Sequence, residues 1–267
     1  MIKNLILLTS LSCGVASLSF AKEKEPEIRK EMRGKTEYMF INGIKVHESD
    51  PKKQPQPKVV EPKPYDAKAA KPPKGAKVLF DGTEKTLSNW TSGNGKPTKW
   101  KLIDGALESV RGGGYLQSTE QFGSCRLHVE FATPKVAKGN GQGRGNSGFY
   151  QVDHYEMQIL DSFGLEGLNN ECGGIYSKKA SDVNGCFPPL SWQTYDVDFK
   201  NARSKDGKKT ANAILTARLN GILIHNGYEI PGKTGGSRAD PEGTPGPIKL
   251  QGHGNPLQFR NIWIMEK

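Results

Sequence analysis

The stretch that decides the fold runs from Cys125 to Ala132 and reads CRLHVEFA. Its polar residues, Arg126, His128 and Glu130, alternate strictly with apolar ones. Successive side chains of a β-strand point to opposite faces of the sheet, so this alternation predicts a strand with one face in a hydrophobic core.

Short runs of the same kind fill the chain from about residue 75 to its end. We expect strands at 77–80, 100–103, 106–110, 125–132, 147–151, 155–160, 174–176, 194–199, 213–219, 222–225, 248–251 and 259–265. Asn220-Gly221 separates two of them and is a strong signal of a two-residue hairpin turn. No window of 12 residues combines a helical period with caps. The pattern predicts an all-β domain, a jelly-roll sandwich of two antiparallel sheets.

The first 21 residues have the pattern of a secretory signal peptide. Lys3 precedes a short apolar run from Leu5 to Leu18, and Ser19-Phe20-Ala21 offers small residues to a signal peptidase. The run is too short to span a bilayer, so we expect no transmembrane segment. We expect cleavage after Ala21 and a secreted or periplasmic protein. Cys13 raises a lipoprotein alternative, but the residues before it match a lipobox poorly.

Residues 22–74 form a Lys/Pro-rich linker, typified by KKQPQPK at 52–58. Such a composition buries too little apolar surface to offset chain entropy, and its prolines favour an extended tether. One part differs: between residues 38 and 47, Asn42-Gly43 separates two β-prone runs, which predicts a hairpin. We expect the jelly-roll domain to cover residues 75–267.

The formal net charge is +10, and it is spread thinly. Residues 22–74 hold 14 Lys/Arg against 9 Asp/Glu, and residues 75–267 hold 23 against 19. Binding of nucleic acid calls for a clustered basic stripe with interleaved aromatic residues, which is not visible here. We expect no nucleic-acid partner. The basic linker suits association with an anionic cell envelope, or simply solubility.

The chain has four cysteines, of which Cys13 leaves with the signal peptide. Cys172 and Cys186 close a small loop rich in Gly, Asn and Pro, so in an oxidising compartment we expect them to form a disulfide. A disulfide that closes a loop of that size stabilises the fold by about 3 kcal/mol, mainly because it restricts the unfolded chain. Cys125 lies in the alternating strand, where we expect a buried, unpaired thiol.

Candidate chemistry is concentrated between Asn146 and Asp161. Glu156 and Gln158 share one face of an expected strand, about 7 Å apart, and we assign the other face, with Tyr155, Met157 and Ile159, to the core. A bulge would bring Asp161 onto the same face. Carboxylates flanking an amide suit binding of sugar hydroxyls or proton transfer. A solvated strand face with no function accounts for the same spacing.

Several motifs occur in a specific order. They are LFDG at 79–82, NSG at 146–148, YEMQILDS at 155–162, IY at 175–176, WQTYD at 192–196 and HGNPLQFRNIWI at 253–264. Together they resemble the 3-keto-disaccharide hydrolase domain family of secreted bacterial proteins, over roughly residues 76 to 266. The resemblance implies a concanavalin A-like jelly roll and cleavage of 3-keto-glycosides or 3-keto-disaccharides.

The implied chemistry is elimination followed by hydration. A ketone at C3 acidifies the hydrogen on C2, so a base removes it, the C1 substituent leaves, and water adds back. Such a site needs a base, an enolate stabiliser and an acid. We expect catalytic residues Glu156, His253 and Asp161, and substrate-binding residues Gln158, Arg260, Asn146, Trp192 and Gln193. A divalent metal on Glu156, Asp161 and His253 would suit carboxylate and imidazole ligands, and the sequence leaves this open.

Two other classes of function stay open. One is a non-catalytic carbohydrate-binding module on the same scaffold, and the other is an envelope-associated adhesion or scaffold protein whose tether is its working part. Arg260 would equally suit a structural ion pair, and Trp192 a place in the core. A binding module needs aromatic platforms, whereas an enzyme needs convergent titratable groups, and Glu156, Asp161 and His253 favour the enzyme.

The domain boundary is testable by limited proteolysis. We expect a protease to remove the linker and leave a stable fragment that starts near Lys74, because an extended Lys/Pro segment has no core to protect it. The new N-terminus can be read by mass spectrometry. Cleavage inside residues 120–200, with none in the Lys/Pro segment, would contradict the boundary.

Overall fold

The structure is a computed structural model of the 267-residue chain. It describes residues 28–33, 36–41, 44–45, 70–133, 139, 141–165, 167–189 and 191–267. The predicted signal peptide and most of the predicted linker lie outside the described residues. Within the described part of the chain, no helix has the length and apolar character needed to cross a membrane.

Three short strands from the linker region form a small antiparallel sheet of their own. They are β1 (Ile28–Arg33), β2 (Thr36–Ile41) and β3 (Ile44–Lys45). β2 and β3 pair with Ile41 opposite Ile44, at the position where the sequence predicts a hairpin. The pairing of β1 with β2 was not predicted.

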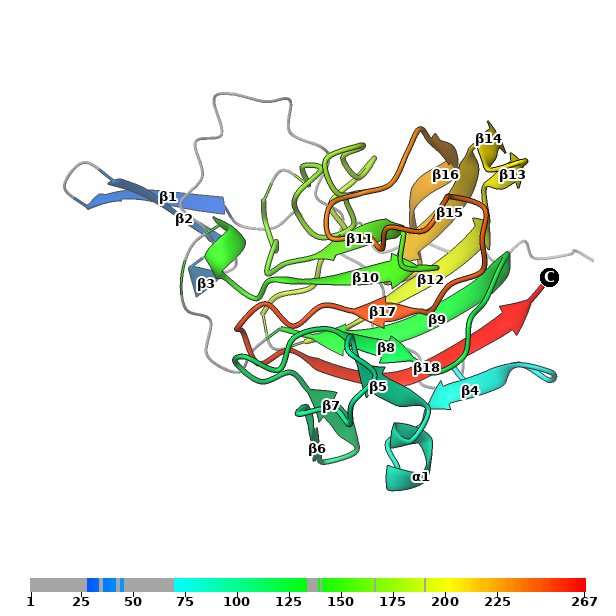
Figure 1. The fold of residues 1–267 in the computed structure, drawn as a ribbon. Helices are drawn as coiled ribbons and strands as arrows, with labels where there is room; N and C mark the ends of the chain where they lie inside the picture. Colours follow the sequence, from blue (N-terminus) through cyan, green and yellow to red (C-terminus); the bar gives the residue numbers. More distant parts are fainter. Residues whose placement is uncertain are drawn as a thin grey trace, which may run out of the picture.

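The main domain is a sandwich of two antiparallel sheets, whose strands run in nearly the same direction in Figure 1. The five-stranded sheet has the order β11 (Tyr155–Ile159), β10 (Ser147–Gln151), β17 (Lys249–Leu250), β8 (Leu116–Ser118) and β5 (Trp90–Ser92). The eight-stranded sheet has the order β16 (Ile222–Ile230), β15 (Ala213–Leu219), β12 (Trp192–Lys200), β9 (Cys125–Ala132), β18 (Gln258–Glu266), β7 (Ala106–Glu108) and β6 (Lys101–Ile103), and β4 (Lys77–Phe80) also pairs with β18.

The core lies between the two sheets, as the alternation predicts. Leu127, Val129 and Phe131 of β9 are fully buried in it. Rings from the two sheets meet there: Tyr155 of β11 lies 5.6 Å from Phe199 of β12, between ring centroids. The prediction of an all-β, concanavalin A-like jelly roll is confirmed.

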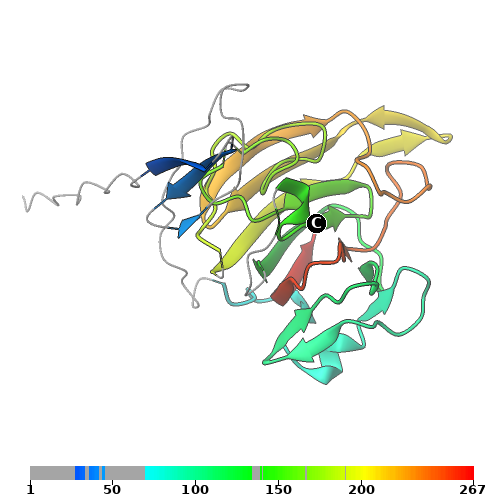
Figure 2. The ribbon, with the colours of Figure 1, turned by 90° about the vertical axis from the view of Figure 1, so that its left-hand side faces the viewer.

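Helix is almost missing from the described residues, which contain the four-residue α1 (Glu84–Leu87) and a 3₁₀ turn at Gly141–Gly143. A further hairpin of β13 (Arg203–Lys205) and β14 (Lys208–Ala211) projects from one end of the sandwich, as Figure 2 shows in yellow. The strand expected at 174–176 is only an isolated bridge, in which Ile175 pairs with Met157.

The turn between β10 and β11 is short, because Gln151 pairs with Tyr155 and only three residues, Val152, Asp153 and His154, connect them. Val152 and Asp153 have positive φ (47° and 53°), and the His154 amide donates to the Gln151 carbonyl over 3.0 Å. This left-handed conformation is costly for a β-branched residue such as valine. Two left-handed residues match the twist of the flanking strands and fix their register.

The predicted disulfide between Cys172 and Cys186 is not formed, which is a correction to the sequence prediction. Both thiols are free and buried, as is Cys125. The thiols of Cys172 and Cys186 contact each other. The Tyr195 hydroxyl lies 3.2 Å from Cys172 Sγ, accepts from the Gly173 amide and donates to the Gln158 carbonyl. Hydrogen bonds to a buried tyrosine, rather than a covalent bond, therefore join this loop to the sheet.

Candidate active site

A cavity of about 270 Å³ lies on the face of the five-stranded sheet that points away from the core. Glu156 and Gln158 line it, whereas their neighbours Tyr155, Met157 and Ile159 belong to the core, so β11 has the facing that its sequence predicts.

Strand register places four polar or aromatic side chains side by side across this sheet. Glu156 of β11 is opposite Tyr150 of β10, Tyr150 is opposite Lys249 of β17, and Lys249 is opposite Gln117 of β8. Residues directly opposite one another point to the same face and interact. The Tyr150 hydroxyl is hydrogen-bonded to the Glu156 carboxyl, and Lys249 Nζ lies 4.0 Å from the centroid of the Tyr150 ring.

Among the described residues that line the cavity, Glu156 is the only one with a carboxyl group. Its side chain is almost completely buried, and this burial raises the pKa of its carboxyl to about 7, against the opposing effects of the Tyr150 hydrogen bond and the Lys249 charge. When the Gln158 side-chain amide is oriented with its nitrogen toward Glu156, it donates to Glu156 Oε1 over 3.3 Å. A carboxyl that titrates near neutral pH in a cavity suits proton abstraction.

The structure explains why the third residue of the Asn146-Ser147-Gly148 motif, which lies in β10, is a glycine. A Cβ atom at this position would lie 2.1 Å from Glu156 Oε1, far inside contact distance. Only glycine therefore leaves room for the carboxyl group over the neighbouring strand.

Three side-chain amides form one wall of the cavity. In the opposite orientation of its amide, Gln158 Nε2 donates to Gln142 Oε1 over 3.1 Å and to Asn146 Oδ1 over 3.2 Å instead of to Glu156. Asn146 Nδ2 donates to the Gln142 carbonyl over 2.8 Å. Asn255 Oδ1 accepts from the Asn146 backbone amide, which joins the loop carrying His253 to this wall. Amides offer donors and acceptors together, as sugar hydroxyls require.

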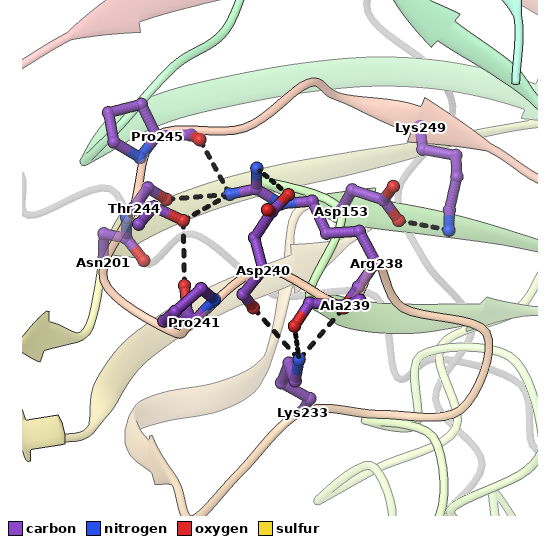
Figure 3. A network of polar contacts seen from close by, with 10 residues as sticks. All are labelled: Asp153, Asn201, Lys233, Arg238, Ala239, Asp240, Pro241, Thr244, Pro245 and Lys249. Carbon is purple, nitrogen blue, oxygen red and sulfur yellow. Dashed lines mark hydrogen bonds and ion pairs between the residues drawn. The ribbon is translucent and has the colours of Figure 1, made fainter. Parts of the chain in front are cut away.

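Another wall is a loop held by the cationic side chains of Lys233, Arg238 and Lys249, drawn in Figure 3. Lys233 Nζ donates to the carbonyls of Arg238, Ala239 and Asp240 over 3.0, 3.2 and 3.1 Å. Lys249 pairs with Asp153.

Two main-chain carbonyls of this loop meet the row of side chains on the sheet. The Gly235 carbonyl accepts from the Tyr150 hydroxyl over 3.1 Å, and the Gly236 carbonyl accepts from Lys249 over 2.6 Å. Both glycines line the cavity, so the loop and the sheet form one connected site.

The expected convergence holds for half of the predicted residues. Glu156, Gln158, Asn146 and His253 line the cavity, with His253 exposed at its rim. Asp161 does not, because the chain turns after β11 and its carboxylate accepts from Arg144 Nε over 2.6 Å in a buried pair.

Arg260, Trp192 and Gln193 belong to the eight-stranded sheet and lie outside the cavity. Arg260 Nε donates to Glu130 Oε2 over 2.7 Å, and its guanidinium lies 3.9 Å from the centroid of the Trp192 ring. Gln193 Oε1 accepts a hydrogen bond from the Phe187 amide over 3.0 Å. These contacts stabilise the fold. The residues that the structure describes contain no cluster of three or more His, Cys, Asp or Glu side chains that could hold a metal ion.

Sequence reasoning did not find Tyr150, Lys249 or the tyrosines at 115 and 176, which also line or support the cavity. Tyr150 was accessible to it, because a three-residue connection at 152–154 pairs residue 151 with residue 155 and so places residue 150 opposite residue 156. The signal for Lys249 was a lone lysine in an apolar run. Its burial, however, depends on a loop that no local pattern predicts.

Comparisons with known proteins agree with this geometry. A crystal structure of a candidate glycosyl hydrolase from Parabacteroides distasonis has 33% sequence identity over 80% of this chain and 93% of its own, with a TM-score of 0.69. Another from the same organism, at 20% identity over 73% of this chain and 94% of its own, has a TM-score of 0.54 and shows the fold alone. A search of curated proteins found no match.

The family and the structural neighbour indicate a carbohydrate-active protein similar to glycosyl hydrolases and lyases. Residues 75–265 match the profile of the 3-keto-alpha-glucoside-1,2-lyase-like domain, and the chain belongs to that family.

The buried Glu156 carboxyl makes stability depend on pH. Its pKa is raised from 4.5 to about 7, so the native state holds a proton that the unfolded state releases, and stability falls as pH rises between these values. We expect Glu156→Gln to unfold with a free energy about 2–3 kcal/mol higher than the wild type at pH 8 and nearly equal at pH 4.5. Urea titrations at both pH values measure this, and a variant destabilised at pH 8 would contradict it.

We expect Arg260 to contribute to the stability of the fold and not to sugar binding in the cavity. Arg260→Leu removes the ion pair of a fully buried Glu130, so we expect a loss of about 3 kcal/mol in unfolding free energy. The exposed Arg218→Leu in the same sheet is the control, with an expected change near zero. Loss of sugar binding by the folded Arg260→Leu protein would restore the original assignment of Arg260.

Proposed function

We propose that the cavity cleaves glycosides whose sugar is oxidised at C3, by base-catalysed elimination and hydration. The observation that carries the proposal is the buried Glu156 carboxyl, with its pKa near 7, on the floor of a cavity with amide and tyrosine walls. Membership of the 3-keto-alpha-glucoside-1,2-lyase-like family supports this substrate class.

In the proposed mechanism the Glu156 carboxylate takes the proton from C2. The electron pair of that bond forms the enolate with the C3 carbonyl, and its return breaks the bond between C1 and the glycosidic oxygen. The leaving alcohol takes a proton from an acid, for which His253 at the rim is our candidate. Water then adds at C1 and a proton returns to C2, so that the net change is hydrolysis.

The remaining donors of the cavity would hold the substrate. Gln158, Asn146 and Gln142 offer amides to sugar hydroxyls, and the Tyr150 hydroxyl lies beside Glu156, where it can donate to oxygen charge that develops on the sugar. This replaces the role that the sequence assigned to Arg260. To donate to the sugar, the hydroxyl would turn its single proton away from the Gly235 carbonyl, while the ring stays against Lys249.

Three tyrosines also line the cavity, at positions 115, 150 and 176, and they favour a second candidate function. Aromatic rings are platforms for sugars, so a non-catalytic carbohydrate-binding module would use the same walls. A binding module would not need a carboxyl group of raised pKa.

We further propose that the protein acts outside the cytoplasm after removal of residues 1–21, and that the basic linker associates with an anionic envelope. Fractionation of cells, with and without a high-salt wash, tests both points, because electrostatic attachment is weakened by salt.

The decisive experiment is incubation of the purified protein with a 3-keto-disaccharide, with sugar release as the readout. We expect Glu156→Gln to lose at least about a hundredfold in kcat/KM, which is the usual contribution of a general base. The exposed Asp206→Asn is the control and should retain full activity. For the wild type, kcat/KM should fall as pH drops below about 7, because the base becomes protonated.

Running the reaction in D₂O distinguishes the mechanism. Elimination and hydration place deuterium at C2 of the released sugar, whereas direct hydrolysis at C1 does not. A parallel reaction with a chelator tests the metal dependence that the sequence left open. Binding of the 3-keto-disaccharide without release of sugar would favour the binding module.

A further inference from the structure

A second hollow, of about 380 Å³, lies beside the cavity and shares one wall with it. The shared wall is Tyr115, which lines both. On the side of the cavity, the Tyr115 ring meets Tyr150 edge to face, with 6.4 Å between centroids. The other walls of the hollow come from the segments 92–99, after β5, and 112–114, before β8.

The backbone joins the hollow to the rim of the cavity. A Cβ atom on Gly252 would lie 2.3 Å from the Gly114 carbonyl, so the chain just before His253 packs directly against the edge of the hollow. Next to Gly114 and Gly112 the space is open: a Cβ atom on either would have no atom within 4 Å. A ligand that leaves the cavity past Tyr115 and His253 therefore meets a surface of bare backbone.

The charged residues that line the hollow are all positive. Lys96 and Lys99 line it and are exposed, and the described residues that line it include no acid. Within the described part of the chain, neither lysine forms an ion pair with a carboxylate. The turn that carries Lys96 is fixed, because the Lys96 amide donates to Asn94 Oδ1 and its carbonyl accepts from Thr91 and Ser92.

We propose that this hollow binds the leaving group of the substrate, and that this group carries an anionic substituent such as the carboxylate of a uronic acid. The inference rests on the proposed function, since it takes the cavity as the site of the 3-keto sugar. His253, between the two spaces, then faces the glycosidic oxygen that must be protonated. Two lysines in a hollow whose described lining contains no acid attract an anion and give a neutral group no advantage.

The test uses a matched pair of substrates that differ by one charge. These are a 3-keto-glucoside of glucuronic acid and the corresponding 3-keto-glucoside of glucuronamide. We expect the wild type to prefer the acid by about fivefold in kcat/KM, the range of two exposed charge pairs. The double variant Lys96→Gln/Lys99→Gln should lose this preference and keep the wild-type rate on the amide. Lys85→Gln, an exposed lysine of α1, is the control.

A second measurement does not depend on the reaction. Calorimetric titration with the unoxidised glucosyl-glucuronic acid should show binding that weakens in the double variant and at high ionic strength. Equal rates on acid and amide by an active wild type would overturn the inference and leave the proposed function intact. If neither substrate is cleaved, the proposed function fails, and the titration then decides on the hollow. Equal binding of the acid and amide disaccharides would overturn the inference that the hollow binds an anionic group. Charge-dependent binding that is lost in the double variant would support it.

Discussion

One buried carboxyl group constrains the whole site. Glu156 lies over a neighbouring strand that has no side chain at Gly148, between the Tyr150 hydroxyl and the Gln158 amide. Burying an ionisable group without these partners would be costly. Tyr150 in turn is held by the Gly235 carbonyl and by Lys249 beneath a loop. The sandwich therefore supplies more than a scaffold, since its strand register decides which groups surround the carboxyl.

The two outer faces of the sandwich carry different polar structures. On the eight-stranded sheet, His128 lies between Asp196 and Glu130, at 2.8 and 3.6 Å. Burial lowers the pKa of His128, but the hydrogen bonds to the two carboxylates outweigh it and raise the pKa overall. Every one of these groups has a charged partner, and so has Arg260. On the five-stranded sheet the hydrogen-bond partners of the Glu156 carboxyl are the neutral Tyr150 and Gln158, although the charge of Lys249 also lowers its pKa. This difference supports the proposed function of that face.

Local alternation was enough to predict the sandwich and the facing of Glu156 and Gln158, because strand periodicity is a property of a few adjacent residues. It could not predict that Asp161 would meet Arg144, or that Arg260 and Trp192 belong to the other sheet. Both facts depend on how distant strands are ordered, which the sequence pattern leaves open. The spacing of Cys172 and Cys186 correctly brought the two thiols together, but it carried no information on Tyr195, whose hydroxyl hydrogen-bonds to that loop.

The three-residue turn from Val152 to His154 has a consequence for how the gene can change. Because side chains alternate with a period of two, inserting or deleting one residue there would exchange the two faces of β11, moving Glu156 into the core and Met157 into the cavity. Long loops elsewhere tolerate changes in length, since loop closure costs little entropy. Length variation should therefore be selected against at this turn even where the identity of its residues drifts.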